Sequence, residues 1–152
     1  MPQQSQSKNL KSVAIDAHGR LDECLKKELR QLYEELATEQ NTVTVHCHQC
    51  GACCNFKAFD HQLWATSLEL DYLADTDGLK PVSINGVCPY MENNQCTARI
   101  GRTLGCRVFL CRQDALEMEL LHEKYINKLR LLAEKYDIEL EYNEFLASLQ
   151  EL

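Results

Sequence analysis

The chain has 152 residues, a hydrophobic fraction of 45% and a formal net charge of −7. This length and hydrophobic fraction predict one globular domain that is large enough to bury its own core. The negative charge argues against nucleic acid and against an anionic membrane surface as partners, because both attract a surplus of Lys and Arg. We therefore expect a single domain over residues 12–152, preceded by a polar, disordered lead over residues 1–11.

Targeting and membrane segments are not evident. The first apolar run, at 13–15, is too short for a signal-peptide core, and no run approaches the roughly 20 apolar residues of a membrane span. The expected compartment is the cytoplasm, where thiols remain reduced. This argues against disulfides, and so does the adjacency of Cys53 and Cys54, because a ring that joins neighbouring residues is strained.

The first half of the chain predicts two helices and a strand. Leucines and Tyr33 recur at helical spacing from Arg20 to about Thr38, with Cys24 at the edge of the apolar stripe, where we interpret it as a small buried hydrophobe. Residues 42–46 alternate and are β-branched, which predicts a short strand leading into the cysteines. The sequence Thr66-Ser-Leu-Glu69 has capping-box spacing and predicts a helix that runs through about Ala74.

In the second half, residues 80–112 are rich in turn signals, including Asn93-Asn94, and predict loops rather than regular structure. A long helix is predicted from Gln113 to Tyr136, with Leu116 and Leu120 on its apolar face. Alternation over 138–142 predicts a short strand, and Asn143 is positioned to cap a final helix that carries Phe145, Leu146 and Leu149. The expected fold is therefore mainly α, with long N- and C-terminal helices packed around a loop-rich, metal-organised cysteine centre (43–112) and one or two short strands.

Eight of the nine cysteines lie between residues 47 and 111, and half of them form one run. Thiols separated by two residues converge on one metal, because the chain can turn between them, and Gly51 permits such a turn. Three thiols in C-x2-C-x2-C spacing wrap iron–sulfur clusters as well as zinc. The predicted metal ligands are Cys47, Cys50, Cys53, Cys54, Cys88, Cys96, Cys106 and Cys111.

The spacing favours an iron–sulfur cluster of the 4Fe-4S type over zinc. Bacterial ferredoxins also have a remote ligand in a Cys-Pro sequence, and Cys88-Pro89 resembles that pattern. Structural zinc sites usually have two separated C-x2-C pairs, and only the first pair is present in this chain. Side chains that are adjacent in an extended segment point apart, so Cys53 and Cys54 are not expected to bind one metal ion equally. Eight thiols fit two four-thiolate sites or one site with spare sulfurs, and the count does not choose between them.

Several arginines crowd the second cysteine group of this acidic chain. A thiolate cluster is negatively charged, so guanidinium groups near it can donate hydrogen bonds to its sulfurs, or they can pair with acidic helix faces. Arg107 lies beside Cys106 and is therefore the candidate for cofactor binding. The other arginines of this group are Arg99, Arg102 and Arg112, and we interpret the histidines near the run, His46, His48 and His61, as non-ligands because thiols are already in excess.

These cysteine segments resemble the CxxCxxCC-motif (YkgJ-like) cysteine-cluster family, which is described as zinc- or iron-chelating. The resemblance covers residues 47–54 and 86–111, where the family usually has Cys-Pro-aromatic, then Cys, then Arg-Pro-x-x-Cys-Arg-x-aromatic. Thr103 stands where the family usually has proline, and Arg99 where it often has tyrosine. A related cysteine module occurs in flagellin lysine methylases, where an iron–sulfur cluster is implicated, but this chain has no evident methyltransferase segment.

Three functions follow from these observations. The first is an iron–sulfur protein for electron transfer, redox sensing or cluster handling, with an unknown protein or redox partner. The second is a zinc-stabilised protein-interaction module. The third, a cluster-dependent enzyme, has the least support, because the sequence shows no nucleophile paired with a base, no phosphate loop and no dinucleotide fingerprint.

Overall fold

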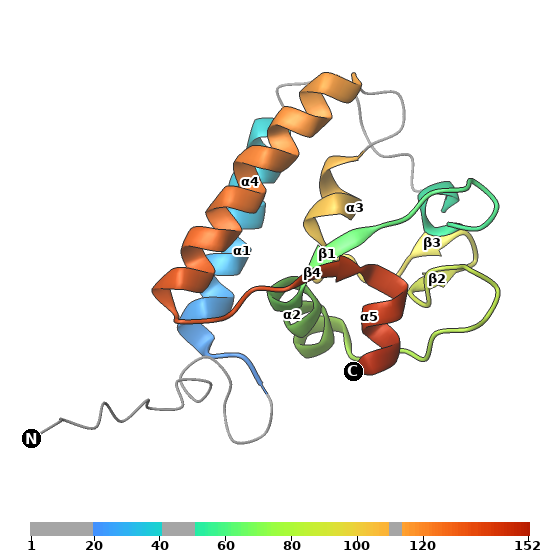
Figure 1. Ribbon diagram of the computed structural model, residues 1–152, viewed down its shortest axis with the longest axis horizontal. Coiled ribbons are helices and arrows are strands. Elements are labelled where there is room, and N and C mark those ends of the chain that lie inside the picture. The colour runs from blue at the N-terminus through green and yellow to red at the C-terminus, as the bar shows by residue number, and fades with distance from the viewer. Residues whose placement is uncertain (1–19, 41–50, 110–113) are drawn as a thin grey trace, which may run out of the picture.

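The computed structural model describes residues 20–40, 51–109 and 114–152, so the predicted lead and the predicted strand at 42–46 lie outside the described residues. Within them the fold is mainly helical, with five α-helices, one 3₁₀ turn and two small two-stranded sheets. Figure 1 shows α1 and α4 side by side on one flank and the short strands β2 and β3 on the opposite flank. No helix in this part of the chain is both long and apolar enough to cross a membrane.

The two long helices form an antiparallel pair. Helix α1 spans Glu23–Gln40 and helix α4 spans Ala115–Lys135. Their orientation follows from the ion pairs between them, since Glu28 pairs with Lys135 and Glu39 pairs with Lys124. The predicted apolar faces are buried between them, which confirms both helices; their buried residues are Leu25, Leu29, Leu32, Tyr33 and Leu36 of α1 and Tyr125, Ile126, Leu129, Leu132 and Ala133 of α4.

The first two turns of α4 differ from the prediction. Leu116 and Leu120 were placed on the buried face, but they are 63% and 59% exposed. Because Glu39 lies beside Lys124 and α1 ends one residue later, at Gln40, the turns of α4 that precede Lys124 extend past the end of α1.

Helix α2 (Ser67–Asp77) begins at the predicted capping box. The Thr66 hydroxyl accepts from the Glu69 N–H, and the Glu69 carboxylate accepts from the Thr66 N–H at 2.7 Å. The helix continues past Ala74 to Gly78, whose φ of 75° ends it. Helix α3 (Leu104–Val108), which the sequence did not predict, begins where the Leu104 N–H donates to the same Glu69 carboxylate. One buried side chain therefore holds the N-termini of two helices.

The C-terminal segment adds a strand and a helix. Strand β1 (Trp64–Thr66) pairs antiparallel with β4 (Tyr142–Glu144), so the strand predicted over 138–142 in fact begins where that segment ends. Helix α5 (Phe145–Glu151) follows directly. Its N-cap is Glu144 and not Asn143, because the Glu144 carboxylate reaches the N–H groups of Leu146 and Ala147.

Of the predicted loop region 80–112 the structure describes residues 80–109, which are mostly loops, as predicted, but also contain helix α3 and a small hairpin. Strand β2 (Met91–Glu92) pairs with β3 (Gln95–Cys96), and the predicted turn at Asn93-Asn94 joins them with positive φ angles of 51° and 62°. Asparagine tolerates this conformation better than most residues.

Buried side chains form two hydrophobic clusters. The helix cluster lies between α1 and α4 and includes Leu68 and Tyr72 of α2, but its members in the described residues include no cysteine. The cysteine cluster contains Cys54 and Cys88 together with Leu70 and Leu73 on the other side of α2. The long helices therefore pack on each other rather than around the cysteines, which corrects the expected arrangement; the members of the cysteine cluster are Cys54, Phe56, Leu63, Ala65, Leu70, Leu73, Cys88, Tyr90, Ala98, Phe145 and Leu149.

Candidate metal centre

The first described cysteines lie on a tight turn. The 3₁₀ turn η2 (Ala52–Cys54) begins after Gly51, whose φ is 75°, and the Cys54 N–H donates to the Gly51 carbonyl at 3.1 Å. A Cβ on Gly51 would lie 2.7 Å from the Asn94 carbonyl oxygen, so glycine is required both by the φ angle and by the close approach of the β2–β3 turn. The tight turn predicted at Gly51 is therefore present, and it lies against the hairpin that carries Cys96.

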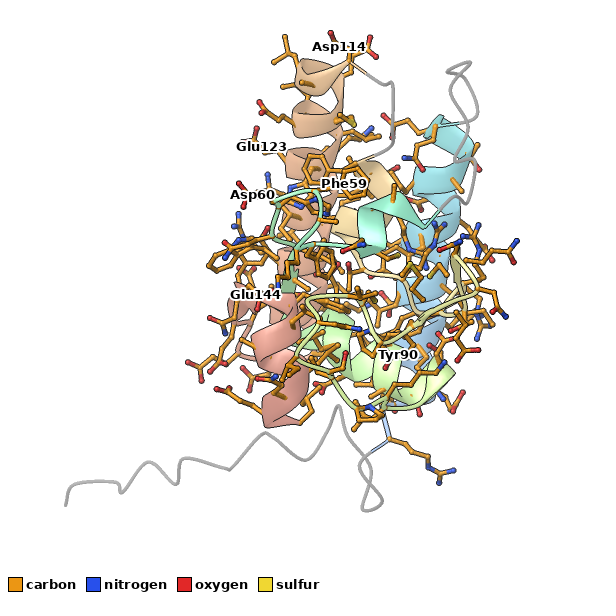
Figure 2. All side chains as sticks on the ribbon, turned by 90° about the vertical axis from the view of Figure 1, so that its right-hand side faces the viewer. Phe59, Asp60, Tyr90, Asp114, Glu123 and Glu144 are labelled. Atoms are coloured by element: carbon orange, nitrogen blue, oxygen red, sulfur yellow. The ribbon has the colours of Figure 1, made fainter. Side chains whose placement is uncertain are left out.

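Backbone pairing brings the two cysteine groups together. The Cys88 N–H donates to the Cys54 carbonyl at 2.8 Å, and Asn55 forms an isolated antiparallel bridge with Val87. Cys96 lies on β3, opposite Met91. In Figure 2, which views the molecule from the side of β2 and β3, the loop with Phe59 and Asp60 after η2 and the segment with Tyr90 after Cys88 belong to the same face of the molecule.

The thiols themselves are in contact through Cys54. Its thiol shares hydrogen bonds with the thiols of Cys53, Cys88 and Cys96, and these bonds, the one with Cys53 first, raise the Cys54 pKa. The pKa values of the three partner thiols shift in the opposite direction. Their hydrogen bonds with Cys54 are the main reason why the pKa values of Cys53 and Cys96 fall to about 6 and why that of Cys88 is lowered. This part of the chain thus offers soft sulfur ligands that give up protons readily.

Cys53 and Cys54 were not expected to bind one metal ion equally, on the assumption of an extended backbone. The backbone here is instead a 3₁₀ turn. Cys53 is exposed and Cys54 is buried, so the two neighbours have different surroundings, and their thiols still interact with each other.

The fifth described thiol comes from α3. Cys106 is half-buried, and its sulfur accepts a hydrogen bond from the Thr103 hydroxyl at 3.4 Å. Burial, and to a smaller extent the charges of Cys88, Cys96 and Cys53, raise the pKa of Cys106 to about 12, although the hydrogen bond from Thr103 lowers it. Cys106 thus lies close enough to the other thiols for their charges to affect its pKa.

These contacts do not assemble a complete metal site among the described residues. Within residues 20–40, 51–109 and 114–152, no three His, Cys, Asp or Glu side chains form a group that could hold a metal ion. Three of the eight predicted ligands, Cys47, Cys50 and Cys111, lie outside the described residues. The described part of the predicted site therefore consists of Cys53, Cys54, Cys88, Cys96 and Cys106.

The arginines near these thiols have different surroundings. The positive charges of Arg102 and Arg99 help to lower the Cys96 pKa, which places both near that thiol. The Arg102 Nε is buried and has no hydrogen-bond partner in the described residues. A buried donor without a partner is costly, so an acceptor beside it, such as a thiolate or a sulfide, would fit. The soft sulfur ligands and this orphaned donor both suit a negatively charged thiolate–metal group.

Arg107, the predicted cofactor-binding residue, has contacts of another kind. Its Nε donates to the Arg102 carbonyl at 2.7 Å and its Nη2 donates to the Ile100 carbonyl. The guanidinium carbon lies 3.9 Å from the centre of the Tyr33 ring on α1. The ring contact attaches α3 to α1, while the charge of Cys106 still acts on Arg107. The hydroxyl of Thr103 is the donor that the structure places on a sulfur.

Two remaining residues complete the comparison with the sequence prediction. The Nε2 of His61 lies 3.0 Å from the Cys53 carbonyl oxygen, so this ring lies near the thiols although its spacing gave no signal. Cys24 was expected to be buried, but it is exposed, on the first turn of α1. It stays outside the site, as predicted.

Sequence reasoning did not find Thr103 or Glu69 as part of the site's support. Glu69 was recognised only as half of a capping box, because its bond with Leu104 joins residues 35 positions apart. Thr103 differs from the proline usual in the resembled family, and that difference was the available signal. Comparisons with protein-family models, with curated proteins and with solved structures find no match to this chain.

Proposed function

We propose that this chain is a metal-binding protein in which cysteine thiolates hold one iron–sulfur centre, of the 4Fe-4S type, for electron transfer, redox sensing or cluster handling. One observation carries the proposal: the Cys88 N–H donates to the Cys54 carbonyl at 2.8 Å, which brings the two cysteine groups together, and the C-x2-C-x2-C spacing of the first group favours a cluster over zinc. Thiols that lie more than 30 residues apart in the sequence meet at one place, which supports one centre rather than two.

The residues would serve this centre in distinct ways. The pKa values of Cys53 and Cys96, at about 6, make thiolates available near neutral pH, as ligation requires, and the pKa of Cys88 is lowered as well. Cys106, with Cys47, Cys50 and Cys111, would supply further sulfurs. Arg102 brings positive charge and an unused donor to the negative group. The cluster, when bound, would supply one-electron redox chemistry.

A single zinc ion is the second candidate, and the contact of the Cys54 thiol with the thiols of Cys53, Cys88 and Cys96 favours it. Zinc–sulfur bonds of about 2.3 Å in a tetrahedron place the sulfurs about 3.8 Å apart, which is close to contact. A four-iron cluster places iron and sulfide between the cysteine sulfurs and so holds them further apart. In that case the protein is a zinc-stabilised module whose helices bind a protein partner.

The test is to purify the protein without oxygen and to measure its visible spectrum together with its iron, sulfide and zinc content. A broad band near 400 nm that dithionite bleaches reversibly, with iron and sulfide in equal amounts, is the expected result. Stoichiometric zinc without a visible band would reject the iron–sulfur cluster and support the zinc-stabilised module instead. Protein that contains neither metal after growth with both available would overturn the proposal.

A matched pair of variants locates the centre. Cys54→Ser removes the thiol at which the others meet and should abolish metal binding, because the set loses its central sulfur. Cys24→Ser replaces an exposed cysteine on α1 and should leave metal content unchanged. Full metal content in Cys54→Ser would place the centre elsewhere in the chain.

A further inference from the structure

Thr103 has an unusual role at the start of α3. It occupies the N-cap position, where threonine ordinarily accepts a hydrogen bond from an N–H of the first helical turn, but its side chain makes no such bond. Its hydroxyl instead donates to the Cys106 sulfur at 3.4 Å. The residue is 1% exposed, so water does not compete for this hydroxyl.

The capping function that Thr103 gives up is supplied by another element. The Leu104 N–H at the start of α3 donates to the buried carboxylate of Glu69 on α2. This carboxylate also accepts from the N–H and the hydroxyl of Thr66, so it satisfies donors of both helices. Because Glu69 caps α3, the Thr103 hydroxyl is available to the sulfur.

The bond also acts on the position of the sulfur. Cys106 lies three residues after Thr103 on the same short helix, and a hydrogen bond to its sulfur selects one orientation of the cysteine side chain. When the sulfur is a thiolate, the bond is charge-assisted and becomes stronger. A donor to a thiolate ligand also withdraws electron density from the metal, which favours the more negative, reduced state.

We propose that Thr103 is a positioning residue of the metal centre, an inference that rests on the proposed function. Its hydroxyl orients the Cys106 sulfur as a ligand and raises the reduction potential of the bound metal. A residue without a hydroxyl at this position could not do this. The Thr103 hydroxyl thus adds a specific hydrogen bond to the Cys106 sulfur.

The test replaces Thr103 in the full chain, purified without oxygen. Thr103→Val keeps the shape of the side chain and removes its hydroxyl donor, whereas Thr103→Ser keeps the hydroxyl. Thr103→Ala replaces Thr103→Val in the experiment if Thr103→Val does not fold. Thr38→Val, which removes an α1 hydroxyl bonded to the Glu34 carbonyl, is the matched control. The readouts are transfer of the bound iron, or of zinc where the protein carries zinc, to a coloured chelator, and the reduction potential of the iron form.

Thr103→Val should release metal about 10 to 100 times faster, the range found when a ligand's outer partner is removed, and should lower the reduction potential. Thr103→Ser and Thr38→Val should behave like the unaltered protein. Release rates and potentials that are the same in Thr103→Val, Thr103→Ala and the unaltered metal-loaded protein would overturn this inference and leave the proposed function intact. An unaltered protein without metal would overturn both.

Discussion

Replacing Glu69 should be among the most damaging single changes in this fold. The carboxylate is 1% exposed and accepts hydrogen bonds from the Thr66 N–H at 2.7 Å, from the Thr66 hydroxyl at 2.8 Å and from the Leu104 N–H. Glu69→Ala leaves both N–H groups buried without this acceptor, at a cost of about 1–3 kcal/mol each. Relief of the desolvation of the carboxylate offsets part of this cost. The expected net loss in the free energy of unfolding is about 3–4 kcal/mol.

Urea unfolding followed by far-ultraviolet circular dichroism measures this loss. Glu123→Ala is the control, because Glu123 is an exposed glutamate on α4 (Figure 2) and its replacement should change the free energy of unfolding by no more than about 0.5 kcal/mol. A loss below about 1 kcal/mol in Glu69→Ala, with an unchanged denaturant slope, would show that Glu69 does not join α2 to α3 in the way the structure indicates.

The same residue predicts a pH dependence with a definite sign. Burial is the main cause that raises the pKa of Glu69 above its ordinary value of 4.5. An acid whose pKa is higher in the folded state stabilises the fold while it is protonated, and this contribution is lost as the pH rises through the folded-state pKa. The stability of the unaltered protein relative to Glu69→Gln, which cannot ionise, should therefore fall as the pH rises above 4.5. A difference that grows with pH would contradict this argument.

Two other perturbations probe the attachment of α3 and the role of the metal. Arg107→Ala removes two hydrogen bonds to carbonyls and the contact with the buried Tyr33 ring. Thermal or urea unfolding should therefore show a decrease of about 2–4 kcal/mol in the free energy of unfolding. A decrease below about 1 kcal/mol would contradict the role of Arg107 in attaching α3. Removal of metal by a chelator should leave most of the helical circular dichroism, because the described helix cluster contains no cysteine, while proteolysis between residues 80 and 112 should accelerate. Complete loss of helical signal would contradict the second prediction.

The helices could be predicted because their signals are local and repeated. The apolar faces of α1 and α4 recur over 18 and 21 residues, so tertiary contacts only confirm a preference that the sequence already has. The start of α2 depends on one capping box within four residues. By contrast, β1 and β4 are three residues long and their pairing joins Ala65 to Asn143. So short a strand has no readable period, and its partner is set by the packing of the whole chain.

Spacing selected the cysteines as candidate ligands, and the structure brings those that it describes close to one another. The spacing did not predict the backbone conformation between neighbouring cysteines. Cys53 and Cys54 lie on a 3₁₀ turn rather than in the extended segment that was assumed. For the same reason Arg107, chosen for its place beside Cys106, turns out to contact Tyr33. Adjacency in sequence on a helix does not fix the direction of a side chain.

Helix α2 joins the two hydrophobic clusters. Its Leu68 and Tyr72 are buried in the helix cluster, whereas its Leu70 and Leu73 are buried in the cysteine cluster. Its Glu69 accepts a hydrogen bond from the first N–H of α3, the helix that carries Cys106. The position of Cys106 therefore depends on a side chain of α2, the helix that packs against both clusters, which is why the loss of one carboxylate is expected to affect more than the end of a single helix.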